Sequence, residues 1–411
     1  MLLYIILALL LGIIAGTITG LIPGIHINLI AVILLGFSAA LLNITSPLTI
    51  IIFITAMAIT HTFVDFIPSI FLGAPDEDSA LSVLPGHKFL LKGRAYFATI
   101  FTLYGSLTAL IIIIIFTPIF IYILPKAYPY VLKIMPIILI IVSSYLIFSE
   151  KQTSKKLWAL IIFLMAGFLG IASLNLNIKE PLLPLLTGLF GASNLIISIK
   201  QKIKIPKQRI IPIKKIRLKK KSIAKAGLAS IIASPFTAFL PGLGASQAAV
   251  IGDRAARNLD QREFLFLLGA INTIVMGLSF ITLYSIQKSR TGAAVAVSKL
   301  IPELTRTNLF YIIGTILIAG IISFFITIFI AKLISKNIHK IPYSKLSLII
   351  LISLTALVFL FSDLFNPLGG IKALLIFITG AALGVSAILL GIRRMHLMGS
   401  LLLPTILFYL L

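Results

Sequence analysis

The sequence has no cysteine, so it can form neither a disulfide framework nor a thiolate site. Charged residues make up only 11% of its 411 residues, whereas 59% are hydrophobic. A water-soluble fold cannot hide that much apolar surface, which excludes a soluble globular protein. Acidic residues are scarce, with 11 against 35 lysines and arginines, and the formal net charge is therefore +24.

The first 87 residues contain no lysine or arginine, because the first basic side chain of either kind is Lys88. Residues 1–20 are therefore a poor signal peptide, and we expect them to form a first membrane helix. The sequence also lacks an H-E-x-x-H metal motif and a G-x-S-x-G element. We therefore expect a protein that is not an enzyme and that carries no cofactor.

Long apolar runs are abundant. The runs 97–122 and 311–331 carry no charge and are long enough to cross a hydrocarbon core of about 30 Å. In lipid only helices and closed barrels satisfy their backbone hydrogen bonds, and the short alternating segments of a barrel do not occur. The sequence therefore predicts an all-α polytopic membrane protein.

Basic residues gather in short loops, and twelve of the 35 lie between Lys200 and Lys225 with no acidic residue among them. By the positive-inside rule we expect residues 200–225 to be a cytoplasmic linker that lies on anionic headgroups of the cell membrane, rather than a nucleic-acid-binding arm. The linker separates two transmembrane units, residues 1–199 and 226–411.

The two units resemble each other. Pro23-Gly24-Ile25 recurs 218 positions later as Pro241-Gly242-Leu243, and later matches, such as Phe163 with Phe377, are 214 positions apart. A nearly constant offset across a whole unit indicates an internal duplication.

The charged loops predict how the units are oriented. The basic loop 151–156 corresponds to the sparse stretch 363–367, and other basic loops likewise correspond to sparse ones. We also expect 96–121 and 136–148 to be separate crossings, joined by a sparse loop with Lys126 and Lys133. A basic loop in one unit that corresponds to a sparsely charged loop in the other predicts inverted repeats, which are typical of secondary transporters with alternating access.

Each unit opens with two apolar segments around a Pro-Gly pair, which breaks a helix. We expect residues 1–42 and 223–252 to be helical hairpins, re-entrant or fully spanning, with Pro-Gly at the tip. Broken backbone at membrane depth lines a cavity or is buried in protein, so the tips are candidate substrate sites; a turn outside the bilayer is the alternative. The candidate substrate-binding residues are Pro23, Gly24, His26 and Asn28 in the first unit and Pro241, Gly242, Gly244 and Ser246 in the second.

A second polar interruption occurs in each unit, at 73–80 and at 287–294. The first contains Asp76 and Asp78, whereas the second contains Lys288, Arg290 and Thr291. The opposite charges predict a coupling cation, Na⁺ or H⁺, near the aspartates and a substrate anion near the basic tip. Solvated loops are the alternative interpretation.

Two ionisable residues, His61 and Asp65, interrupt the apolar run 50–71. Their spacing of four residues places them on one helix face, where ionisable groups are costly and are functional candidates. We expect them either to relay protons at the coupling-ion site or to form a buried hydrogen-bonded pair that steadies the bundle. Thr60, Thr62 and Thr273 are candidates either to line the same cavity or to bond back to their own helix.

Three segments resemble one transporter family: 20–28 (GLIPGIHIN), 239–246 (FLPGLGAS) and 394–399 (RMHLMG). They are similar to the TctA-like family, the large membrane subunit of tripartite tricarboxylate transporters, and particularly to its shorter archaeal-type members. The resemblance implies a permease for carboxylate anions that is driven by an ion gradient. It also implies a small membrane subunit and an extracytoplasmic binding protein as partners.

These features together predict a secondary-active permease for an organic anion, a di- or tricarboxylate, coupled to Na⁺ or H⁺. A flippase for polyprenyl-phosphate lipids is the alternative, because a basic tip also suits a lipid phosphate. An intramembrane enzyme and a pure scaffold fit less well, since the catalytic motifs are missing and a scaffold has no evident need of inverted repeats with polar breaks.

Overall fold

The computed structural model describes residues 2–22, 45–73, 83–200, 204–239, 245–256, 259–288, 291–301, 303–363 and 366–411. Throughout these ranges every regular element is helical, which confirms the all-α class. Nine helical segments of this described part are long and apolar enough to cross a membrane, so the protein is a multi-pass membrane protein.

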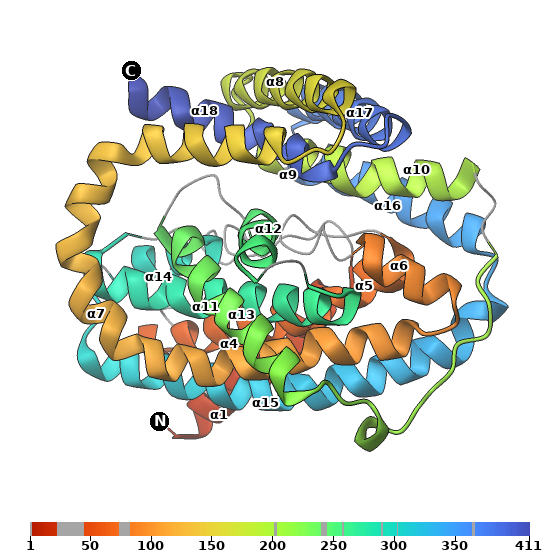
Figure 1. The fold of residues 1–411 in the computed structure, drawn as a ribbon. Coiled ribbons are helices and arrows are strands. Elements are labelled where there is room, and N and C mark those ends of the chain that lie inside the picture. The colour runs from red at the N-terminus through yellow and green to blue at the C-terminus, as the bar shows by residue number, and fades with distance from the viewer. Residues whose placement is uncertain are drawn as a thin grey trace.

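The helices form two bundles with separate hydrophobic cores, one below the other in Figure 1. The first bundle contains α1 (Leu2–Leu21), α4 (Pro47–Val64), α5 (Phe66–Leu72), α6 (Val83–Leu91), α11 (Lys220–Phe239), α12 (Ala245–Ala255), α13 (Gln261–Ile286), α14 (Gly292–Leu300) and α15 (Arg306–Asn337). The second contains α8 (Thr153–Asn175), α9 (Leu182–Leu186), η2 (Thr187–Ala192), α10 (Ser193–Lys200), α16 (Tyr343–Phe361), α17 (Pro367–Leu389), η5 (Arg394–Met398) and α18 (Gly399–Leu410). Each bundle therefore takes helices from both sequence units.

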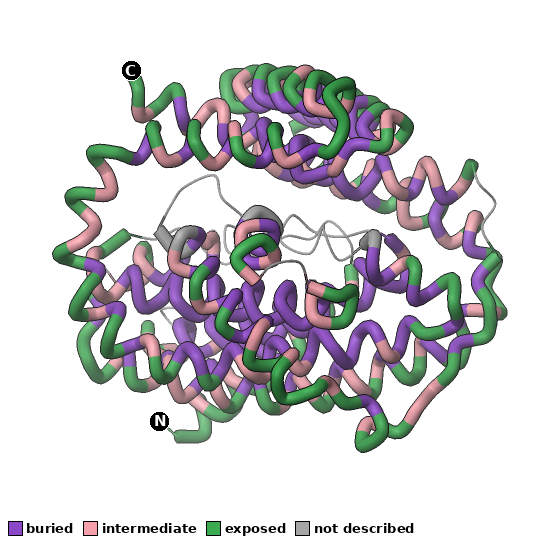
Figure 2. Tube along the Cα trace, in the orientation of Figure 1, coloured by how far each residue is buried: buried purple, intermediate pink, exposed green. Residues whose placement is uncertain are grey.

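Burial differs between the helices. Figure 2 shows exposed residues along the outer faces and buried residues concentrated inside the first bundle. Helices α4 and α13 are buried almost throughout, whereas α1, α15 and α16 present large apolar side chains outward. Outward apolar surface is what lipid-facing helices require, so α1, α15 and α16 are suited to face lipid. Helices α4 and α13, by contrast, form the protein-enclosed centre of the first bundle.

Helix α7 (Ala95–Phe148) joins the bundles at one edge of the molecule (Figure 1). Its 54 residues include the segment around Lys126 and Lys133, so the loop predicted there is wrong. Four prolines, at positions 118, 125, 129 and 136, each remove a backbone donor, and they let the helix bend from one bundle to the other without ending. At the opposite edge, α15 and α16 make the equivalent crossing through the short turn η4 (Ile338–Lys340).

The linker between α10 and α11 lies against the first bundle and has little regular structure beyond η3 (Ile213–Lys215). Its buried Gln208 side chain accepts a hydrogen bond from Ala95 N at 2.9 Å and donates one to the Leu90 carbonyl at 3.0 Å. The lysines of this segment are exposed around that anchor. A polar side chain fixed on α6 and α7 thus holds the linker and leaves the lysines between Lys204 and Lys219 exposed.

Helix bounds repeat at the sequence offsets. Helix α8 and helix α17 are each 23 residues long and are 214 positions apart, and α1 and α11 are each 20 residues long and 218 positions apart. The continuous segment 47–72 likewise matches α13 in length and offset. Equal lengths at the expected offsets support the duplication of the chain.

Helices α8 and α17 run in opposite directions. At the start of α8, Ser149 Oγ accepts a hydrogen bond from Arg393 Nη1 at 3.0 Å, and Arg393 lies beyond the end of α17. At the end of α8, Lys179 N donates to Asp363 Oδ1 at 3.4 Å, and Asp363 precedes α17. Equivalent helices that run antiparallel are what inverted repeats require. The inversion across the membrane stays a prediction.

Because the sequence has no cysteine, single introduced cysteines test that prediction. The exposed residues Gln152 and Asn366 precede α8 and α17 at equivalent positions. We expect Gln152→Cys and Asn366→Cys to react with a membrane-impermeant maleimide from opposite sides. Lys179→Cys is the control, because its backbone contact with Asp363 puts it on the side of Asn366. Labelling of Gln152→Cys and Asn366→Cys from one side contradicts the inversion.

Candidate functional site

The continuous span 47–72 contains one turn, at its acidic residue. Helix α4 ends at Val64 and α5 begins at Phe66, so Asp65 lies in a turn between them. Pro68 explains the break, since it has no N–H to bond the Val64 carbonyl and its ring crowds that carbonyl. The Asp65 N–H still bonds the His61 carbonyl at 3.0 Å, so the two residues remain one helical turn apart.

Both ionisable side chains are buried and each contacts a different helix. His61 Nδ1 lies 3.1 Å from Thr19 Oγ1 on α1. Asp65 Oδ2 accepts a hydrogen bond of 2.8 Å from Asn272 Nδ2 on α13. Asp65 is only 3% exposed and Asn272 only 4%. A carboxylate at this depth is a candidate site for a proton or a Na⁺ ion.

Threonines extend this polar contact to a further helix. Thr62 Oγ1 lies 3.2 Å from Thr273 Oγ1, and the Ser323 hydroxyl on α15 donates to Thr60 Oγ1 at 2.8 Å. The structure thus brings Thr62 and Thr273 into contact, whereas Thr60 meets Ser323; the Thr62 hydroxyl also donates to the Ile59 carbonyl of its own helix. We call this group the polar seam; its members are Thr19, Thr60, His61, Thr62, Asp65, Asn272, Thr273 and Ser323.

The seam includes three residues that sequence reasoning missed, Thr19, Asn272 and Ser323. Each is a polar residue in a long apolar helix, and Asn272 is adjacent to Thr273, which was selected. The available signal was a polar side chain inside an apolar run. It does not identify which residues meet, because the contacts join positions more than 40 residues apart.

Most of the other candidate residues lie outside the described part of the chain. These are Pro23, Gly24, His26, Asn28, Asp76, Asp78, Pro241, Gly242, Gly244 and Arg290. Ser246 lies in the first turn of α12, and Lys288 follows the end of α13. Helix α12 has 11 residues, about 16 Å at 1.5 Å per residue, which is too short to cross the membrane alone.

Thr291 has a local structural role. Its Oγ1 accepts a hydrogen bond from Ala294 N at 3.3 Å, and so caps the N-terminus of α14. The same oxygen lies 2.8 Å from Ser279 Oγ on α13. Thr291 therefore fixes where α14 begins after the basic tip, and its predicted role in substrate binding stays a prediction.

A cleft of about 520 Å³ lies where the two bundles meet. The first bundle contributes Lys88 from α6 and Arg254 from α12, and the second contributes Arg393 and Arg394. The cleft's acidic residue, Asp253, accepts a hydrogen bond from Leu259 N at 2.7 Å and thereby holds the turn before α13. Burial lowers the pKa of His87 beside Lys88, so this histidine adds no charge at neutral pH. The cleft is thus basic.

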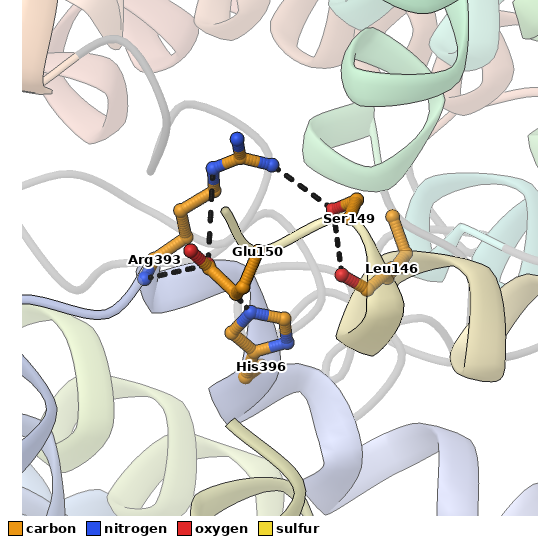
Figure 3. Close-up of polar contacts among 5 residues, drawn as sticks. All are labelled: Leu146, Ser149, Glu150, Arg393 and His396. Carbon is orange, nitrogen blue, oxygen red and sulfur yellow. Dashed lines mark hydrogen bonds and ion pairs between the residues drawn. The ribbon is translucent and has the colours of Figure 1, made fainter. Parts of the chain in front are cut away.

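One wall of the cleft is held by Glu150, which lies between α7 and α8 (Figure 3). This buried carboxylate accepts hydrogen bonds from Arg393 N at 3.3 Å and from His396 Nε2 at 3.0 Å, and it lies 3.8 Å from Arg393 Nε. Arg393 Nη1 also donates to Ser149 Oγ, which in turn donates to the Leu146 carbonyl. The charge of Arg393 is therefore largely compensated inside the protein.

Comparison with known proteins agrees with this picture. Residues 6–399 match the family model described as "Tripartite tricarboxylate transporter TctA family". An uncharacterized protein of Methanocaldococcus jannaschii, MJ1079, is 32% identical over 364 residues, which cover 87% of this chain and 88% of the relative. No solved structure matches the chain. The match extends over nearly the whole sequence, so this chain belongs to the TctA family and is a membrane component of a tripartite tricarboxylate transporter.

Proposed function

We propose that this protein is the permease of a secondary-active transporter that moves a di- or tricarboxylate across the cell membrane by alternating access. The observation that carries the proposal is the polar seam, which places a buried carboxylate between α4 and α13 in an apolar bundle. A buried acid that contacts the other sequence unit is suited to couple ion binding to a rearrangement of the two units. Asp65 is the proposed coupling-ion residue, with His61 beside it.

The fold supports the alternating-access part of the proposal. Equivalent helices run antiparallel, both bundles contain both units, and α7 carries four prolines where it passes between them. We propose that the Pro-Gly tips and Arg290 bind substrate and that Asp76 and Asp78 assist the coupling ion. A small membrane subunit and an extracytoplasmic binding protein are the proposed partners, and the linker 200–225 is proposed to face the cytoplasm. Family membership does not favour the flippase alternative.

A counterflow experiment tests this function without a binding protein. Proteoliposomes containing the purified protein are loaded with unlabelled citrate or succinate and diluted into a trace of the labelled compound. We expect labelled carboxylate to accumulate in exchange, and the accumulation to depend on Na⁺ or on pH. Exchange of no carboxylate under any ion condition contradicts the proposal. Movement of a polyprenyl phosphate instead would support the flippase.

A further inference from the structure

Arg394 is a buried cation with neutral neighbours. It begins η5 and is 7% exposed. Its Nη2 donates to the carbonyls of Leu189 and Phe190 in the π-helical turn η2, and to Ser193 Oγ at 3.0 Å. All three acceptors are uncharged. In the described residues, no ion pair includes this guanidinium.

Two further N–H groups of Arg394 are buried without a hydrogen-bond acceptor. Across the described part of the chain, no group accepts a hydrogen bond from its Nε or its Nη1. A buried donor without an acceptor costs about 1–3 kcal/mol, and more when the group is charged. Proteins seldom retain such a group without a functional reason, and a carboxylate ligand would satisfy it.

Arg394 lines the cleft described above, so a ligand there lies beside its guanidinium. The Nε and Nη1 atoms are themselves enclosed by protein, and the guanidinium must turn toward the cleft for a carboxylate to reach them. Its volume of about 520 Å³ lies within the usual range for small-molecule sites. Of the other cations, Lys88 and Arg254 are exposed on the opposite wall, whereas Arg393 is engaged by Glu150. The cleft therefore offers one buried guanidinium and two exposed cations to an anion.

We propose that this cleft between the bundles is a binding site for a small di- or tricarboxylate, with Arg394 as the buried anion-binding residue and Lys88 and Arg254 as the opposing cations. The choice of carboxylate over other anions rests on the proposed transport function. One carboxylate group would accept hydrogen bonds from the guanidinium fork of Arg394, and a second would face the cations of the first bundle. A ligand held in this way contacts both bundles at once.

Titration calorimetry on the detergent-purified protein tests the site with citrate, inorganic phosphate and uncharged trimethyl citrate. We expect citrate to bind, phosphate to bind more weakly and the ester not to bind.

Arg254→Gln and Lys88→Gln should each weaken citrate binding about tenfold, the effect of losing one charge-assisted hydrogen bond. Arg394→Lys keeps the charge but loses the fork, and it should weaken binding at least as much. Lys332→Gln, which removes an exposed cation on α15 outside the cleft, should bind like the natural protein.

The outcomes separate this site from the transport proposal. Unchanged citrate affinity in both Arg254→Gln and Arg394→Lys overturns the site, and so does equal binding of citrate and its ester, or tighter binding of phosphate. If counterflow of carboxylates persists while the cleft variants bind normally, the site is wrong and the transport function stands. If citrate binds in the cleft but no carboxylate is exchanged, the site stands and the transport function is wrong. In the described part of the chain, the exposed side chains of Arg254 and Lys88 form no hydrogen bond that holds the fold. Their variants therefore remain informative even if Arg394→Lys misfolds.

Discussion

Replacing Asp65 with asparagine should lower ion-driven carboxylate uptake about 10- to 100-fold while the protein still folds. The amide keeps the shape of the side chain and its oxygen still accepts from Asn272, so packing in the seam is preserved. The negative charge that would hold a proton or Na⁺ is lost. A hydrogen bond to a charged group contributes about 1.5–3 kcal/mol, and each 1.4 kcal/mol changes a rate tenfold. Uptake into proteoliposomes under imposed Na⁺ and pH gradients measures the effect.

Thr55→Val is the matched control for Asp65→Asn. Thr55 lies on the same helix and is fully buried, and within the described residues its hydroxyl has no hydrogen-bond partner. The substitution is isosteric and should leave both uptake and ion dependence unchanged. If Asp65→Asn keeps the natural protein's rate and its dependence on Na⁺ and pH, Asp65 is not the coupling residue.

Replacing Gly105 with alanine should destabilise the first bundle by about 3 kcal/mol or more. A Cβ at Gly105 would lie 2.0 Å from the Phe266 carbonyl oxygen, and one at Gly269 would lie 2.0 Å from the Thr102 carbonyl oxygen. Here α7 and α13 pack backbone against backbone, and Ser106 Oγ donates to the Gly269 carbonyl at 3.1 Å. Neither helix can move aside without disturbing the core. The thermal midpoint of the detergent-purified protein, followed by size-exclusion fluorescence, reports the loss.

Gly314→Ala is the control for this prediction, because a Cβ at Gly314 on α15 meets no atom within 4 Å. The midpoint should stay the same or rise slightly, since alanine favours helix by up to about 1 kcal/mol over glycine. Gly269→Ala should repeat the Gly105→Ala effect, and the double variant should cost less than the two effects added, because both act on one contact. Equal midpoints for Gly105→Ala and Gly314→Ala contradict the close approach.

The sequence predicted the helical class because long uncharged runs admit few other structures in lipid. It also predicted corresponding helices, since α8 and α17 have equal lengths at the offset of 214. Local patterns fix such properties. The structure of the Pro-Gly tips stays a prediction, because the tips fall outside the described residues.

Two local features escaped sequence reasoning although their signals were present. Pro68 marked the turn at Asp65, which the sequence analysis did not predict within the run 50–71. The segment around Lys126 and Lys133 was predicted to be a loop, whereas the backbone there bends and continues as helix. A proline removes one hydrogen bond, and the neighbouring packing decides whether the helix ends or bends.

The cleft could not be predicted from local patterns. Arg394 appeared only within a motif that resembled a family, and its burial against η2 depends on contacts about 200 positions away along the chain. Glu150 was likewise an ordinary loop acid until the fold brought Arg393 and His396 to it. Counting charges along the sequence identifies basic loops, but it does not show which basic side chain is buried without an acidic partner.

The three connections between the bundles restrict how one can move past the other. Helix α7 crosses at one edge of Figure 1, whereas the linker and the turn between α15 and α16 cross at the opposite edge. If the bundles opened like a hinge about one edge, the connecting segments at the opposite edge would be stretched. Two motions are compatible with these connections. One bundle can slide along the other, or it can rock about the line that joins the two edges.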